Sequence, residues 1–180
     1  MIQFIGALIS GLNLGSIYAL IALGYTMVYG IAKMLNFAHG DIIMVGAYSV
    51  IVSAVTLKLP PIVAILIAVV VCAALGVTIE FLAYRPLRQS PPLAVLITAI
   101  GVSYLLQNLA LLIFGPEQKS TPALFDLPSL TLGGVTVDGI TLLTLGVTAA
   151  IMVGLTLFIN LTRMGKAMRA VSEDRDAAEL

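Results

Sequence analysis

The sequence predicts an all-α, polytopic integral membrane protein with about five transmembrane helices and an external N-terminus. Hydrophobic residues make up 60% of the 180 residues and charged residues only 10%, against roughly 25% charged residues in an average soluble domain. The charges are bunched, and the five long uncharged stretches of the chain are each a candidate for a span of about 20 mostly apolar residues. The apolar residues show no period-two alternation, which favours helices over barrel strands.

Five spans follow from this pattern, near residues 4–31, 40–57, 62–83, 93–114 and 140–161. The first apolar run is too long for a typical signal peptide and lacks a basic segment before it, so it indicates an uncleaved span. Pro60-Pro61, Pro91-Pro92 and Gly115-Pro116 stand at predicted helix ends, since proline cannot continue a helix. Residues 1–162 are therefore predicted to form one transmembrane domain.

Basic residues in the loops predict the orientation, because lysine and arginine are enriched on the cytoplasmic side. Seven basic residues follow the first, third and fifth spans: Lys33, Arg85, Arg88, Arg163, Lys166, Arg169 and Arg175. Only two, Lys58 and Lys119, lie on the opposite side. The N-terminus and the long segment 115–139 are therefore predicted to be external.

The segment Leu35–Asp41 is a short hinge between two apolar spans and holds the only histidine of the chain. Ionisable groups are costly in hydrocarbon and usually face a packed interior or a water-filled path. Four residues of the hinge are therefore candidates for the lining or gate of a translocation path: Asn36, His39, Gly40 and Asp41. A second interpretation stays open, in which Asn36 or Asp41 caps a helix start and His39 lies at the headgroup level.

Other polar groups lie inside the spans. Asn13, Gln107 and Asn108 either bond a neighbouring helix or line the same path. The pair Gly11 and Gly15 and the lone Cys72 are predicted to serve helix packing. The formal net charge is zero, which gives no reason to expect nucleic-acid binding. The sequence contains no metal-ligand cluster and no Walker A pattern, so we expect no cofactor and no ATP bound by this chain.

Several ordered blocks resemble the branched-chain amino acid ABC transporter permease family, and the resemblance covers nearly the whole chain. The blocks are Gly15–Ile31, Leu35–Asp41, Gly46–Tyr48, Glu80–Arg88, Thr98–Ser103 with Leu106–Asn108, and Arg163–Asp174. Residues 115–140 match least. Family members continue beyond the Ala177–Leu180 region with further membrane helices, so the chain resembles the N-terminal part of such a permease.

The resemblance implies a transport subunit without chemistry of its own, in a bacterial or archaeal inner membrane. It would form the translocation path for branched-chain (hydrophobic) amino acids with a second permease, identical or not. Separate cytoplasmic ATPase subunits would bind ATP, and an external solute-binding protein would deliver the solute. Urea and short-amide permeases are similar. A channel or ion-coupled transporter in which His39 and Asp41 relay protons, or an assembly partner without a path, also stays open.

The resemblance makes residues 163–180 a cytoplasmic segment that couples the permease to an ATPase. Ser172 is a candidate N-cap of a short amphipathic helix, with Glu173 and Asp174 in its first turn. Six residues are predicted to serve the coupling: Arg169, Ser172, Glu173, Asp174, Ala177 and Ala178. The other interpretation is a solvated helix that links two spans. The external segment 115–139 is either a docking surface for the binding protein or a connector.

Overall fold

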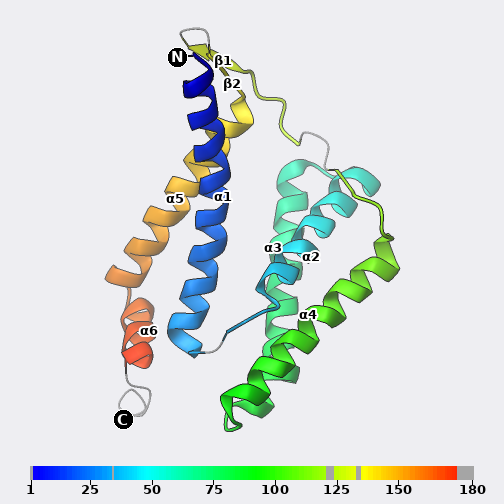
Figure 1. The fold of residues 1–180 in the computed structure, drawn as a ribbon, viewed down its shortest axis with the longest axis vertical. Helices are drawn as coiled ribbons and strands as arrows, with labels where there is room; N and C mark the ends of the chain where they lie inside the picture. Colours follow the sequence, from blue (N-terminus) through cyan, green and yellow to red (C-terminus); the bar gives the residue numbers. More distant parts are fainter. Residues whose placement is uncertain (1, 34, 121–123, 133–134, 174–180) are drawn as a thin grey trace. The chain divides into compact units, whose positions relative to one another are not determined.

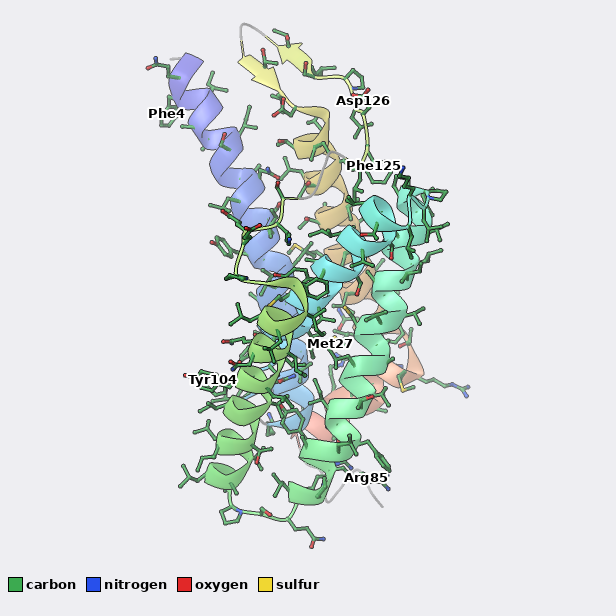
Figure 2. The ribbon with its side chains drawn as sticks, turned by 90° about the vertical axis from the view of Figure 1, so that its right-hand side faces the viewer. Phe4, Met27, Arg85, Tyr104, Phe125 and Asp126 are labelled. Atoms are coloured by element: carbon green, nitrogen blue, oxygen red, sulfur yellow. The ribbon has the colours of Figure 1, made fainter. Side chains whose placement is uncertain are left out.

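The computed structural model describes residues 2–33, 35–120, 124–132 and 135–173. The chain divides into two units, which are described here one at a time. The first holds Met1–Lys33 and Asp126–Leu180, and the second holds Met34–Phe125. The chain returns to the first unit between Phe125 and Asp126 (Figure 2).

Among the described residues, five helices are long and apolar enough to cross a membrane. They are α1 (Ile2–Ala32), α2 (His39–Ile51), α3 (Pro61–Ile79), α4 (Pro92–Phe114) and α5 (Gly139–Leu161). A π-helical turn η1 (Val52–Thr56) extends α2, and the turns η2 (Glu80–Tyr84) and η3 (Arg85–Leu87) extend α3. These helices begin and end within a few residues of the predicted spans. The all-α, multi-pass class is thus confirmed, while the external N-terminus stays a prediction.

Proline and glycine set several of these helix ends. Pro61 and Pro92 occupy the first positions of α3 and α4, where the missing N–H has no intrahelical partner in any case. Gly115 ends α4 with φ 80°, a left-handed conformation that glycine adopts without a steric cost. The proline and glycine signals in the sequence therefore mark these ends correctly.

In the first unit, α1 and α5 lie side by side, and both begin at the end that carries a small hairpin (Figure 1). Strand β1 (Leu130–Leu132) pairs antiparallel with β2 (Val135–Val137), with Leu130 opposite Val137. The interpretation of segment 115–139 as a docking surface or a connector included no strands. The signal for them is the alternation of threonine with leucine or valine on both sides of Gly133-Gly134, a sequence typical of a tight hairpin.

The last described helix, α6 (Arg163–Glu173), follows α5 after a single residue. Thr162 caps it, because the Thr162 Oγ1 accepts a hydrogen bond of 3.0 Å from the Gly165 N–H. The predicted helix start at Ser172 is therefore wrong: Ser172 lies in the last turn of α6 and its hydroxyl donates to the Arg169 carbonyl oxygen at 2.7 Å. Threonine and serine hydroxyls bond backbone at either place, so the sequence alone did not separate them.

The second unit packs α2, α3 and α4 around a small apolar core. The core residues are Ala38, Ile79, Tyr84, Val95, Ala99 and Leu106. Helices α2 and α3 approach closely at Gly46, where an added Cβ would lie 2.8 Å from the Cys72 Sγ. Cys72 also contacts the Ile42 carbonyl oxygen at 3.5 Å, so its predicted role in packing is confirmed.

For the pair Gly11 and Gly15 of α1, a role in helix packing stays a prediction. A Cβ added at either position would have no atom within 4 Å among the described residues. The described structure therefore places no helix against this pair. Small residues permit close approach of helices but do not by themselves supply a partner.

Candidate functional site: the hinge before α2

The hinge Leu35–Asp41 is held from the far end of the third span. The Asn36 Oδ1 accepts two hydrogen bonds, one of 3.1 Å from the Ala38 N–H and one of 2.8 Å from the Tyr84 hydroxyl. Ala38 is completely buried beside Tyr84 in the core of this unit. The bend is thus fixed by a local turn of Asn36 and by a contact with a residue 48 positions away.

Asp41 is held from α4. It is 7% exposed and lies in the first turn of α2, where the helix dipole favours a negative charge. The Gln107 Nε2 donates to the Asp41 Oδ1 at 3.1 Å and to the Ser103 Oγ at the same distance. A buried carboxylate in this position has oxygen lone pairs that can accept further hydrogen bonds.

The structure decides between the two interpretations of the hinge as far as capping is concerned. The N-cap position of α2 is Ala38, which makes no side-chain cap hydrogen bond. The prediction that Asp41 caps a helix is therefore wrong, because its described hydrogen bond goes to another helix. Asn36 instead bonds the backbone N–H of Ala38, ahead of the helix.

The contacts of α2 also place Asp41 away from the ends of α4. Gln107 lies fifteen residues after Pro92 and seven before Phe114, which corresponds to roughly 22 Å and 10 Å along the helix axis. Tyr48, seven residues after Asp41, stacks on Phe114 with 4.0 Å between ring centroids. The two helices thus run in the same direction over this stretch. His39 is the first residue of the candidate span His39–Thr56, and its position at the headgroup level stays a prediction.

The remaining candidates differ in their surroundings. His39 is half-buried as the first residue of α2, and its backbone N–H donates to the Asn36 carbonyl oxygen at 3.2 Å. Gly40 is exposed, with no atom within 4 Å of an added Cβ in the described structure. Asn108 is exposed and donates to the Tyr104 carbonyl oxygen of its own helix at 2.7 Å. Asn108 therefore does not join the hinge site, and Tyr104 projects outward from α4 (Figure 2).

Asn13 lies in α1, in the other unit, and lines a cavity described below. Of the predicted coupling residues, Arg169, Ser172 and Glu173 belong to α6. Asp174, Ala177 and Ala178 lie outside the described residues. Glu80, a third ionisable group close to the spans, forms an exposed ion pair with Arg88.

Tyr84 and Ser103 also belong to the hinge site, although neither was predicted to do so. The predicted topology contained a signal for Tyr84, because it puts the end of the third span on the same side of the membrane as the hinge. Ser103 precedes Gln107 by one helical turn, where side chains on one face of a helix meet. No group of three or more potential metal ligands occurs among the described residues.

Comparison with known proteins identifies the family of this chain. Residues 7–180 match the family described as "Branched-chain amino acid transport system / permease component". The chain belongs to this family. No solved structure matches it.

Two relatives illustrate the match. The chain is 41% identical over 96% of its length to the high-affinity branched-chain amino acid transport system permease protein BraD of Pseudomonas aeruginosa. It is 38% identical over 99% of its length to the corresponding protein LivH of Escherichia coli K12. The chain spans 60% and 62% of the lengths of these relatives. The resemblance inferred from the ordered blocks is thus confirmed at the level of the family.

Proposed function

We propose that this chain forms part of the translocation path of an ABC importer for branched-chain amino acids, in a bacterial or archaeal inner membrane. The observation that carries the proposal is the buried Asp41 at the start of α2, which Gln107 bonds well inside the length of α4. Carboxylates in membrane-spanning helices are costly and rare, and where they occur they commonly mark a substrate or ion path. The relatives named above, described as permease proteins for branched-chain amino acids, support the choice of solute.

In this proposal the hinge site is a gate between helices. The Asp41–Gln107 hydrogen bond joins α2 to α4, and the Asn36–Tyr84 bond joins the hinge to the end of the third span. A shift of α2 along α4 must break the first bond, while the short connection at Leu35–Ala38 has the polar groups to be re-bonded by water. His39 and Gly40, the first two residues of α2, would move with the helix in such a shift.

The chain contributes no catalysis in this proposal. ATP is hydrolysed on partner ATPase subunits, and α6 carries their motion to the membrane helices. Support comes from the junction between α5 and α6, where a single residue joins two helices and Gly165 packs against the backbone of Ile159. Because this connection is short and closely packed, a movement of α6 would be transmitted to α5. A second permease subunit completes the path, and an external solute-binding protein delivers the amino acid.

Uptake measurements test the proposal. The transport system containing this chain is expressed in cells that lack their own branched-chain amino acid importer, and uptake of labelled leucine is followed. We expect uptake that unlabelled isoleucine and valine inhibit, that urea and acetamide do not, and that ceases when the partner ATPase carries an inactivating substitution. Uptake that persists with the inactive ATPase and follows the proton gradient would instead establish an ion-coupled transporter.

A further inference from the structure

The first unit contains a cavity of about 390 Å³ that the proposed gate does not use. The first half of α1, strand β2 and the beginning of α5 line it, and it is open on one side. These elements meet at the end of the unit where α1 and α5 both begin (Figure 1). The volume falls within the range of roughly 300–1,000 Å³ that small-molecule sites occupy. On the predicted topology this end is external.

An unpaired acceptor lines the cavity. The Asn13 Oδ1 is buried and has no hydrogen-bond partner in the described part of the chain. Most buried side-chain oxygens are hydrogen-bonded, so the free Asn13 Oδ1 is available to a donor group that enters the cavity. A molecule in the cavity would supply that donor to Asn13.

A carboxylate also lines the cavity. Asp138 stands directly before α5 but makes no side-chain cap hydrogen bond there. The Asp138 carboxylate therefore makes no hydrogen bond to the start of α5 and can bind another donor. Ser10 and Thr141 add two hydroxyls to the lining, and none of the described lining residues is basic. The cavity thus offers acceptors and one negative charge, which matches an occupant that carries a cationic donor.

Apolar side chains complete the wall. Ile9 and Ile17 belong to the same face of α1 as Asn13, two helical turns apart from each other. An aliphatic group of the occupant would lie against them and be removed from water, which stabilises the bound state. The lining therefore suits a small molecule with a cationic group at one end and a short aliphatic chain at the other.

We propose that this cavity binds the ammonium group of a short, branched aliphatic amine through Asp138 and Asn13, with the aliphatic chain against Ile9 and Ile17. The proposal rests on the proposed function in one respect: in an importer of branched-chain amino acids, the occupant would be the amino acid itself. The α-carboxylate has no cationic partner among the described lining residues, so it would remain toward water.

Binding is measured by ligand-observed NMR on the purified chain in lipid nanodiscs, with empty nanodiscs as the blank. The probes are leucine, isoamylamine, which has the ammonium group but no carboxylate, and isocaproate, which has the carboxylate but no ammonium group. We expect saturable binding of leucine and isoamylamine and none of isocaproate. Binding of isocaproate as tight as that of the amine, or no binding of either ammonium compound, would overturn the proposal.

Substitutions locate the site. Asp138→Asn preserves the size of the side chain and removes its charge, and it should weaken binding of isoamylamine by about tenfold or more, because a charge-assisted hydrogen bond is lost. Asn13→Leu should act in the same direction. The matched control is Asp126→Asn, which changes a carboxylate of the same external segment that does not line the cavity and should leave binding unchanged. Equal affinity of the wild type and Asp138→Asn would exclude this site.

The outcome is separable from that of the proposed function. If the transport system takes up leucine but the chain does not bind isoamylamine, the cavity proposal is refuted and the proposed importer function is supported. If isoamylamine binds in an Asp138-dependent way but the system imports no branched-chain amino acid, the cavity proposal is supported and the proposed importer function is refuted. Because the Asp138 side chain makes no cap hydrogen bond, its substitution should leave the fold unchanged, which thermal unfolding of the variant checks.

Discussion

Gln107 bonds Asp41 from the interior of α4, at 3.1 Å and seven residues before the helix ends. A second contact joins the same two helices: Tyr48, seven residues after Asp41, stacks on Phe114, seven residues after Gln107. Two contacts at the same spacing hold α2 and α4 in one register over two helical turns. Any movement of α2 along α4 must release both contacts.

Gln107→Leu should destabilise the protein. The substitution removes the described donor to the buried Asp41 carboxylate, and a buried acceptor without a partner costs about 1–3 kcal/mol. Thermal unfolding in detergent measures the change, with Asn108→Leu as the control, because Asn108 is exposed like Gln107 but bonds only its own helix in the described contacts. If both variants unfold at the same temperature, the Asp41–Gln107 bond contributes nothing to stability.

Tyr84→Phe should weaken the hinge by about 1 kcal/mol, the usual net value of one hydrogen bond. The variant keeps the buried ring and loses only the hydroxyl that donates to Asn36. Tyr104→Phe is the control, since Tyr104 is 63% exposed. In a double-mutant cycle with Asn36→Ala, the two losses should fail to add; full additivity would mean that the Asn36–Tyr84 contact is not formed.

Gly165→Ala should uncouple α6 from α5. An added Cβ would collide with the backbone of Ile159, and backbone cannot move aside as a flexible side chain can. We expect the five spans to insert normally while ATPase association or substrate-stimulated ATP hydrolysis falls. Gly154→Ala, in α5 with open space around it, is the matched control. Wild-type coupling in Gly165→Ala would exclude this junction as the coupling element.

The predicted orientation is tested by cysteine labelling in a Cys72→Ala background. A cysteine at Ser129, in the segment 115–139, should react in intact cells with a thiol reagent that does not cross membranes. A cysteine at Ser90, between the third and fourth spans, should react only after the cells are opened. The reverse pattern, or equal labelling, would contradict an external N-terminus.

The sequence predicted the spans well because their determinants are local. Each apolar run is bounded by a charge, a proline or a glycine, so the ends of α3 and α4 are encoded in Pro61, Pro92 and Gly115. The same local signals predicted the hinge at Leu35–Asp41. Local signals do not identify the partners of Asn36 and Asp41, since Tyr84 and Gln107 come from helices far along the chain.

The errors have similar causes. Asn108 is as polar as Gln107, but one residue along a helix turns the side chain by about 100°, and Asn108 consequently bonds its own helix. Ser172 has the residue type of an N-cap, yet Thr162, the single residue between α5 and α6, occupies that position. Residue type alone therefore proposes polar contacts, whereas helix phase and tertiary packing select among them.

The most direct test of the gate is leucine uptake by the Asp41→Asn variant, measured together with its abundance in the membrane. Asparagine keeps the size of the side chain and an oxygen that accepts from Gln107, so the packing of α2 on α4 should survive. We predict normal abundance with uptake reduced by about tenfold or more, because the charge at the gate is lost. Unchanged uptake, or abundance that falls in step with uptake, would contradict a role of Asp41 in the path.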